Sequence, residues 1–334
     1  MALYLGVDGG NTKTVALVAD EAGHVIGFGR TSGSDIYAAD TEEDAIDEVA
    51  LAVDAALAAA GAKRSDLSSA AFGLAGADWP EDFLLLDSAF RARGFGRHLV
   101  VVNDAIGALR AGSPTGFGVV LVAGSGMAIA ARSSEDRVWH SSNWPTACGG
   151  AGLGEAAIDA IFREHLDVGP ATALTLMVLE RTGTSSAEDL LHLLTARGKR
   201  RWVLCDYARL APIVLTAAEH GDAVATEIVA SCAEMIGTHA VAAAHRVGLG
   251  PEPFPLVLCG GVFRRPLLRE HPMMLGKIQA AFPGIVPIHS TLEPAAGALL
   301  LAFDGEHPGR GEQVRDQIRH TMPSSSVFAT EPDC

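Results

Sequence analysis

The sequence has few cysteines, few aromatic residues and no excess of positive charge. Its cysteines are scattered, odd in number and without a CxxC pair: Cys148, Cys205, Cys232, Cys259 and Cys334. This spacing argues against a disulfide framework and favours a reducing cytoplasm. Asp and Glu outnumber Lys and Arg by 40 to 25, which leaves a net charge of −15. That balance argues against nucleic acid or an anionic membrane as a partner.

Long hydrophobic runs and a signal peptide are also missing. The apolar stretch 236–247 is interrupted by Thr238, His239, His245 and Arg246, so we expect a buried helix there and not a membrane span. No basic segment precedes the first strand, which predicts no secretory leader. The twelve histidines show no metal-binding spacing. A chain of 334 residues, 49% of them hydrophobic, predicts two domains with a substantial core.

The most informative local pattern is an apolar run that ends in Asp8, Gly9 and Gly10. Residues 3–7 and 13–19 predict two strands joined by a tight turn, because glycine reaches positive φ without steric cost. The uncovered N–H groups of such a turn can hold phosphate oxygens, and Asp8 can hold Mg²⁺ through its waters. Further donors follow in the same turn: Asn11, Thr12 and Thr14. An ordinary hairpin has the same pattern.

The first part of the chain predicts a mixed sheet covered by helices. A third strand at 24–30 completes an antiparallel meander. Strands and helices then alternate, with these expected positions: a helix from a Thr41 cap to Gly61, a strand at 70–74, a helix from Pro80, a strand at 99–102 and a helix at 106–111. The stretch 112–116 is punctuated by glycine and proline, which predicts a domain boundary.

The second part begins with the same pattern of strand, glycine turn and strand, at 119–123, 124–126 and 128–131, which suggests a duplicated domain. Further expected strands lie at 137–140, 255–258 and 285–288. Expected helices lie at 156–166, 171–181, 187–195, 203–220, 222–247, 266–282 and 294–302. Residues 148–154 predict a glycine-rich loop, and the polar residues 304–334 predict a loose tail.

Four segments of the sequence, 7–13, 102–105, 121–126 and 258–262, occur in an order that resembles a known family. They resemble the ATPase domains shared by actin, sugar kinases and heat-shock chaperones, most of all the N-acetylglucosamine kinase and BadF/BadG/BcrA/BcrD ATPase branch. Residues 73–78, Gly-Leu-Ala-Gly-Ala-Asp, match a motif of that branch. The resemblance covers residues 3 to about 302.

The resemblance implies an α/β fold of two duplicated ribonuclease H-like (actin-like ATPase) domains with a nucleotide cleft between them. The expected domains are residues 1–113, joined by the last helix at about 292–303, and residues 114–291. It also implies an enzyme that uses ATP and Mg²⁺ to phosphorylate the 6-hydroxyl of an amino sugar, N-acetylglucosamine or glucosamine. The expected partners are this small sugar and, through the helix 222–247, a second copy of the chain.

The resemblance assigns roles to individual residues. Asp104 is the base and Asp8 holds the metal. Phosphates and adenosine bind between three glycine-rich segments: Gly9, Gly10, Asn11, Thr12 and Lys13; Gly124, Ser125 and Gly126; Gly260 and Gly261. Sugar contacts are expected from Ser34, Asp35, Gly76, Asp78 and Asn103. Asp104 also follows an apolar strand, where α/β sheets place functional groups, although an Asp there can equally cap the next helix.

One motif departs from the family. N-acetylglucosamine kinases usually carry Gly-Asp-Glu-Gly-Ser in the loop that this chain fills with residues 148–155. The acidic sugar contact is therefore missing unless Glu155 replaces it, and the identity of the sugar stays open. One alternative is an activator ATPase of the 2-hydroxyacyl-CoA dehydratase or benzoyl-CoA reductase type, with an iron–sulfur cluster bridged by two subunits. Another is a non-catalytic sugar sensor, which would be expected to lose Asp8 or Asp104.

Overall fold

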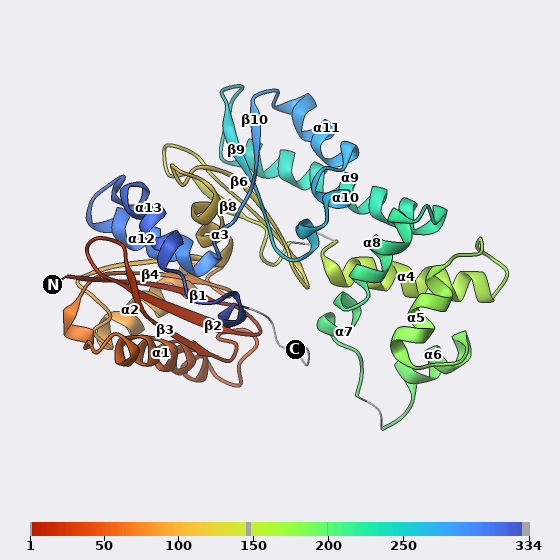
Figure 1. Cartoon of the computed structure of the whole chain (residues 1–334), viewed down its shortest axis with the longest axis horizontal. Coiled ribbons are helices and arrows are strands. Elements are labelled where there is room, and N and C mark those ends of the chain that lie inside the picture. The colour runs from red at the N-terminus through yellow and green to blue at the C-terminus, as the bar shows by residue number, and fades with distance from the viewer. Residues whose placement is uncertain (1, 145–147, 199, 329–334) are drawn as a thin grey trace.

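The computed structural model describes residues 2–144, 148–198 and 200–328. They form two mixed five-stranded sheets with helices packed on them (Figure 1). The strand orders are β3-β2-β1-β4-β5 and β10-β9-β6-β7-β8. In both sheets a three-stranded antiparallel meander is extended by two parallel strands. The expected α/β class and the duplication of the meander are therefore confirmed.

The first sheet and its helices carry the predicted elements with bounds shifted by a few residues. The strands are β1 (Leu3–Gly9), β2 (Thr14–Ala19), β3 (Val25–Thr31), β4 (Leu67–Leu74) and β5 (His98–Asn103). The helices are α1 (Glu42–Ala59), α2 (Pro80–Ala92) and α3 (Asp104–Gly112). As expected, Thr41 caps α1, and its hydroxyl accepts from the Asp44 N–H at 3.1 Å.

The second sheet is followed by a larger helical part. Its strands are β6 (Gly118–Ala123), β7 (Met127–Arg132), β8 (Val138–His140), β9 (Phe254–Cys259) and β10 (Ile285–His289). The helices are α4 (Gly150–His165), α5 (Leu174–Thr182), α6 (Ala187–Thr195), α7 (Leu204–Ala208), α8 (Ala211–Glu219), α9 (Ala223–Arg246), α10 (Pro266–Arg269), α11 (Pro272–Ala281), α12 (Pro294–Glu306) and α13 (Arg310–Thr321).

Helices α3 and α12 lie between the two sheets (Figure 1). Buried residues of both sheets meet α3 and α12 in one apolar cluster, which includes Ala71, Ile106, Leu109, Val257 and Leu301. The contact between the helices is close, since a Cβ on Gly297 would lie 1.9 Å from the carbonyl oxygen of Gly107. Packing on both sides of α3 therefore joins the two halves.

Three expected elements in the second half were wrong in detail. The stretch 203–220 is two helices, α7 and α8, and 266–282 is also two helices, α10 and α11. Pro272 starts α11 behind a His271 cap, because proline lacks the N–H that a continuous helix needs. Most of the expected glycine-rich loop is helical, since α4 already begins at Gly150.

The loose tail that the polar sequence predicts at 304–334 is also wrong over its described part. Helix α12 continues to Glu306, and α13 packs Val314 and Ile318 against the first sheet. The guanidinium of Arg315 is buried and donates to the carbonyl oxygens of Arg110, Ala111 and Ser113 at 2.7 to 3.0 Å. An i, i+4 apolar pair and one buried ion are enough to fold a segment of polar composition. Residues 329–334 lie outside the described part.

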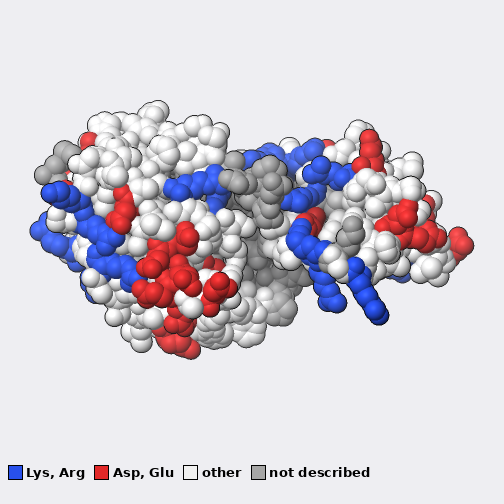
Figure 2. Space-filling view, turned by 90° about the horizontal axis from the view of Figure 1, so that it is seen from below, with Lys and Arg blue, Asp and Glu red and all other residues white. Residues whose placement is uncertain are grey.

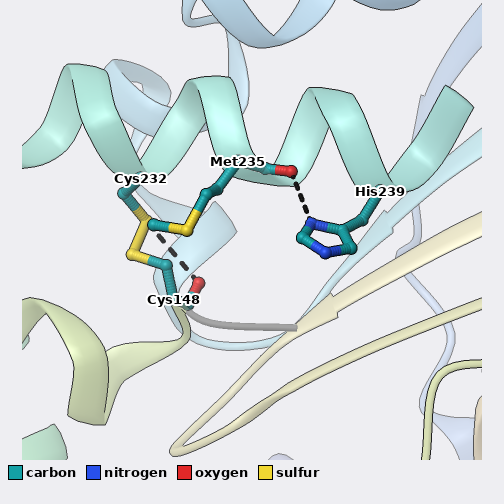
Figure 3. Close-up of a disulfide and its surroundings, with 4 residues drawn as sticks. All are labelled: Cys148, Cys232, Met235 and His239. Carbon is teal, nitrogen blue, oxygen red and sulfur yellow. Dashed lines mark hydrogen bonds between the residues drawn. A yellow bond between two sulfur atoms is a disulfide. The ribbon is translucent and has the colours of Figure 1, made fainter. Parts of the chain in front are cut away.

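A disulfide joins Cys148, just before α4, to Cys232 in α9, against the expectation from the scattered cysteines (Figure 3). The Cα atoms are 5.5 Å apart although the residues are 84 positions apart in the sequence. Spacing along the chain carries no information on this contact, which the packing of α4 on α9 creates. The disulfide also removes one argument for a reducing compartment.

The charged surface agrees with the acidic composition, and the helices agree with the lack of long hydrophobic runs. Figure 2 shows acidic side chains gathered over the half that carries α1, with basic side chains beside them. The first turn of α1 alone contributes Glu42, Glu43 and Asp44. Within the described ranges, we find no helix with the length and hydropathy that a bilayer crossing requires.

Candidate active site

The candidate site lies where three parallel strands of the first sheet end. The registers of β1, β4 and β5 place Asp8 beside Gly73, and Gly73 beside Val102. Asp104 follows β5 directly as the first residue of α3. A Cβ on Gly73 would lie 3.7 Å from the Cα of Asp104. The carboxyl ends of the strands thus bring Asp8 and Asp104 to the same edge of the sheet.

Both carboxylates are half-buried, and both have a raised pKa. Burial, and then the charge of Asp104, raises the pKa of Asp8 to about 7. Burial raises the pKa of Asp104 to about 6, although a hydrogen bond from the Ala105 N–H lowers it; Asp78 raises it further. A carboxylate with a pKa near 6 is ionised at neutral pH and holds a proton more tightly than a free one, which suits a general base.

The start of α3 shows that capping does not require Asp104. Asn103 is the N-cap residue, and its side-chain oxygen accepts from the Ala105 N–H at 3.1 Å. The Oδ1 of Asp104 accepts from the same N–H at 2.8 Å. Both side chains thus accept from one N–H, so α3 keeps a capping acceptor in Asn103 even without Asp104.

The first glycine turn connects β1 to β2 beside these carboxylates. Gly10 donates to the carbonyl oxygen of Lys13 at 2.9 Å, which closes the turn. Asn11 and Thr12 are exposed at its tip, and Lys13 is half-buried. Burial lowers the pKa of Lys13, whereas the charges of Asp8 and Glu293 raise it. The turn therefore presents one ammonium group close to the strand-end carboxylates.

Ser34, which the sequence assigns to the sugar, supports this turn. Its side chain is 2% exposed, and its hydroxyl accepts from Thr14 Oγ1 at 2.7 Å. Its N–H donates to the carbonyl oxygen of Gly10 at 3.0 Å. A Cβ on Gly9 would lie 2.4 Å from the Ser34 hydroxyl, so Gly9 is needed for this close contact. Ser34 thus packs against the turn on its buried side and stabilises its conformation.

The second glycine turn, residues 124–126, is backed by the start of α4. The N–H groups of Gly150 and Ala151 donate to the carbonyl oxygens of Gly124 and Ser125, at 2.9 and 2.8 Å. A Cβ on Gly149 would lie 2.1 Å from the carbonyl oxygen of Gly126, the last residue of the turn. The glycines after Cys148 therefore serve this close packing.

The third glycine segment follows β9. Gly260 has φ +97°, and a Cβ there would lie 2.4 Å from the carbonyl oxygen of Ala123 at the end of β6. Around Gly261 a Cβ would meet no heavy atom within 4 Å, so its surface is open. The first glycine segment thus connects β1 to β2 in the first sheet. The second and third follow β6 and β9, which are neighbours in the second sheet.

Asp78 lies at the centre of a pocket to which both halves contribute. It accepts from Asn103 Nδ2 at 3.0 Å, Ser142 Oγ at 2.5 Å and Asn143 Nδ2 at 3.3 Å. His140 Nδ1 lies 2.6 Å from the Ser142 hydroxyl. A cavity of about 190 Å³ opens here, lined also by Trp79 and Trp144. Indoles together with hydrogen-bonding groups of this kind suit a small polar ligand.

Asp35 and Gly76, two of the expected sugar contacts, lie close together. A Cβ on Gly76 would be 2.6 Å from Asp35 Oδ1, which accepts from the Tyr37 N–H at 2.9 Å. Burial raises the pKa of Asp35; the hydrogen bond from Tyr37 lowers it, and the charge of Asp78 raises it. Since Asp35 and Asp78 both raise the pKa of Asp104, the three carboxylates share one region.

Sequence reasoning missed four residues of this region: His140, Ser142, Asn143 and Glu293. The first three touch Asp78 or one another across segments that no local motif connects. Glu293 is the residue directly before α12, and its charge raises the pKa of Asp8 and of Cys259. Its only signal in the sequence was its position before Pro294.

The altered loop does not bring Glu155 to this pocket. Glu155 is exposed on α4 and lines a separate cavity of about 660 Å³ with Cys148, Cys232 and Met235. Figure 3 shows Met235 beside the disulfide and His239 one turn further along α9. Because Cys148 and Cys232 are bonded to each other, neither is a thiolate ligand. The activator alternative with its iron–sulfur cluster is accordingly less supported.

The two mixed sheets with their duplicated meander have the fold of actin-like ATPase domains. Residues 5–302 match the BadF/BadG/BcrA/BcrD ATPase family, and the chain belongs to that family. The N-acetyl-D-glucosamine kinase of Dictyostelium discoideum is 28% identical over 318 residues, 91% of this chain and 98% of the relative. The N-acetylmuramic acid/N-acetylglucosamine kinase of Clostridium acetobutylicum is 26% identical over 78% of this chain and 86% of the relative.

Solved structures share the fold. A Chromobacterium violaceum protein assigned as an N-acetylglucosamine kinase has a TM-score of 0.68 and 23% identity, over 90% of this chain and 98% of that one. A ROK family glucokinase of Streptomyces griseus, in complex with glucose and AMPPNP, has a TM-score of 0.52 and 18% identity, over 94% and 99%.

Proposed function

We propose that the protein is an ATP-dependent kinase of an amino sugar, N-acetylglucosamine or glucosamine, acting on the 6-hydroxyl. The observation that carries this proposal is the pair of half-buried carboxylates, Asp8 and Asp104, between a glycine turn and the Asp78 pocket. Two relatives named as kinases of N-acetylglucosamine support the substrate class, and the match covers 98% and 86% of their lengths.

In the proposed mechanism the three glycine segments hold ATP. Backbone N–H groups of the turns at residues 9–13 and 124–126 face the phosphates, and the Lys13 ammonium adds a positive charge. The open surface at Gly261 takes the flat adenosine. Phosphoryl transfer needs little covalent chemistry from a protein, so holding and aligning the phosphates provides most of the effect.

The sugar would lie in the Asp78 pocket with its hydroxyl toward Asp104. Asp78, Asn103 and Asp35 supply acceptors and donors for sugar hydroxyls, and the indoles of Trp79 and Trp144 supply apolar faces. Asp104 accepts the hydroxyl proton as the oxygen attacks the terminal phosphorus, whose bond to the bridging oxygen breaks and releases ADP. Ser34 acts indirectly, since it supports the turn that holds the phosphates.

The residues around Asp8 fit a magnesium ion. Asp8 carries a raised pKa because of burial and a neighbouring carboxylate, and Glu293 lies close enough to act on it. Magnesium uses one or two carboxylates with water and phosphate oxygens, and it would neutralise phosphate charge. Within the described ranges no group of three or more acidic, His or Cys side chains forms a ready protein cage. Asp8 would therefore hold the ion through water, with Glu293 as a second carboxylate.

We also propose the domain bounds 1–113 with 292–303, and 114–291, a cytoplasmic location, and a homodimer. The structure weakens the argument for the dimer. The sequence favours a subunit contact because the helix 222–247 carries apolar residues on more than one face. In the structure Val229, Ile236 and Val247 are buried against the chain itself, and Val224, Ile228 and Val241 are half-buried. Of these apolar residues Met235 alone is exposed.

A screen for ADP release tests the proposed function. The purified chain is mixed with ATP, magnesium and one sugar at a time: N-acetylglucosamine, glucosamine, N-acetylmuramic acid, glucose and a buffer blank. We expect ADP release far above the blank with N-acetylglucosamine or glucosamine, and a product phosphorylated at the 6-hydroxyl by NMR. Release that no sugar stimulates would contradict the proposal.

A further inference from the structure

The last described residues, 325–328, reach back to the first glycine turn. The Lys13 ammonium donates a hydrogen bond to the carbonyl oxygen of Phe328. Arg30 on β3 donates to the carbonyl oxygens of Ser326 at 3.3 Å and Val327 at 3.2 Å. This last described stretch, dark blue in Figure 1, lies beside β2. We call residues 325–328 the C-terminal strap.

The strap is held by its own apolar anchor. Phe328 is 8% exposed and packs in a cluster with Val15 and Leu17 of β2 and with Val314 and Ile318 of α13. Helix α13 is itself fixed to the end of α3 by the buried guanidinium of Arg315. Because α13 tethers the strap, its local concentration at Lys13 is high even when single contacts break.

The strap is hydrogen-bonded to the ammonium group that would bind phosphate. Lys13 contributes the positive charge of the nucleotide turn, yet its ammonium is directed to a neutral carbonyl. Arg30 and Arg264 lower the pKa of Lys13 along with burial, while Asp8 and Glu293 raise it. A phosphate oxygen is a stronger partner than a carbonyl for an ammonium group, so nucleotide can displace the strap but must break this contact first.

We propose that the C-terminal strap competes with nucleotide phosphates for Lys13 and so lowers the affinity of the free protein for ATP. The inference rests on the proposed function, which assigns Lys13 to the phosphates. The family match ends at residue 302, so the strap belongs to a part of the chain that the match does not cover. Any event that lifts residues 325–328 would raise nucleotide affinity.

The test compares nucleotide binding by calorimetry in four proteins, using a nonhydrolysable ATP analogue with magnesium. They are the full chain, a chain that ends at Ser324, the variant Arg30→Met, and the control Arg319→Met. Arg319 pairs with Asp316 on the exposed side of α13 and does not touch the strap. We expect the truncated chain to bind about tenfold more tightly, since a charge-assisted hydrogen bond no longer has to be broken. Arg30→Met should bind about threefold more tightly, and the control should match the full chain.

Equal affinity of the full and truncated chains, or weaker binding by the truncated chain, would overturn the strap proposal alone. Failure of all four proteins to bind nucleotide would overturn the proposed function together with it. Amide hydrogen exchange on the unmodified chain gives a second measurement that no truncation can disturb. Nucleotide should increase exchange within residues 325–328 while α13 stays protected, and unchanged exchange there would contradict displacement.

Discussion

At the scale of single residues, Asp8 and Asp104 are unfavourable for the folded chain. Burial is the main cause of both raised pKa values, about 7 for Asp8 and about 6 for Asp104. Between about pH 4 and 7, these two carboxyl groups therefore hold more protons in the folded chain than in the unfolded chain. Stability from these groups must fall as the pH rises through that range and stay low above it. Such a cost at a half-buried pair is typical of functional sites.

Replacing Asp8 by Asn should therefore stabilise the protein while it impairs the proposed activity. We expect the melting temperature to rise by about 2–4 °C at pH 8, where wild-type Asp8 is ionised, and by less at pH 4.5. Activity should fall and need more magnesium. The exposed Asp87→Asn, in the Asp87–Arg91 pair of α2, is the control. A loss of stability in Asp8→Asn, or a gain that does not change with pH, would contradict this account.

How well single residues could be predicted depended on whether their surroundings are local in sequence. Asp8 and Asp104 each follow an apolar strand, so a strand-end position could be predicted for both. The contact between Asp78 and Ser142 spans 64 positions and joins two halves, and no pattern in either segment indicates it. Ser34 was predicted as a sugar contact, and its buried position beside Thr14 at the first glycine turn depends on the fold of three segments.

At the scale of elements, the disulfide between Cys148 and Cys232 fixes the start of α4 to α9. The same start of α4 backs the glycine turn 124–126 through the N–H groups of Gly150 and Ala151. A crosslink over a long loop restricts the unfolded chain and typically contributes about 2–4 kcal/mol. Loss of this bond should therefore loosen the support of the glycine turn 124–126.

The double variant Cys148→Ala/Cys232→Ala should accordingly unfold at a lower denaturant concentration. Its free energy of unfolding should be about 2–4 kcal/mol below that of the wild type. A thiol reductant should destabilise the wild type more than it destabilises the variant, because only the wild type has this bond to lose. Urea unfolding followed by circular dichroism measures both differences. An equal response of the two proteins to reductant would show that the bond does not form in solution.

Secondary structure was predictable where periodicity was strong and failed where one residue decided the outcome. The ten strands found in the described residues and the long helix α9 were expected near their observed places. The division into α10 and α11 depends on His271 and Pro272, and α13 depends on two apolar side chains in a polar segment. Composition averages over such residues, so it predicted a continuous helix in one case and a tail in the other.

At the scale of the whole molecule, the proposed nucleotide and sugar sites draw on both halves. The glycine turns at 9–13 and 124–126 follow different sheets, and the Asp78 pocket takes Ser142 and Asn143 from the second half. A site shared in this way favours closure around ligands. We place the hinges near residues 112–118 and 290–293, on either side of the packed pair α3 and α12.

Small-angle scattering should detect this closure. The radius of gyration should be smaller with sugar and a nonhydrolysable nucleotide together than with either ligand alone. The chain without ligands and the chain with each single ligand are the controls. If no compaction occurs with both ligands bound, as shown by calorimetry in the same buffer, the two halves do not move as proposed.

The central claim, that Asp104 is the base of a sugar kinase, is tested most directly by Asp104→Asn. The amide keeps the size of the side chain and Asn103 keeps the helix cap, so the fold should be preserved. We expect turnover to fall by about 10²–10⁴-fold, as for other general bases, with little change in sugar affinity by calorimetry. In the wild type, turnover should decline below about pH 6, where Asp104 becomes protonated. Near-normal turnover in Asp104→Asn would contradict the mechanism.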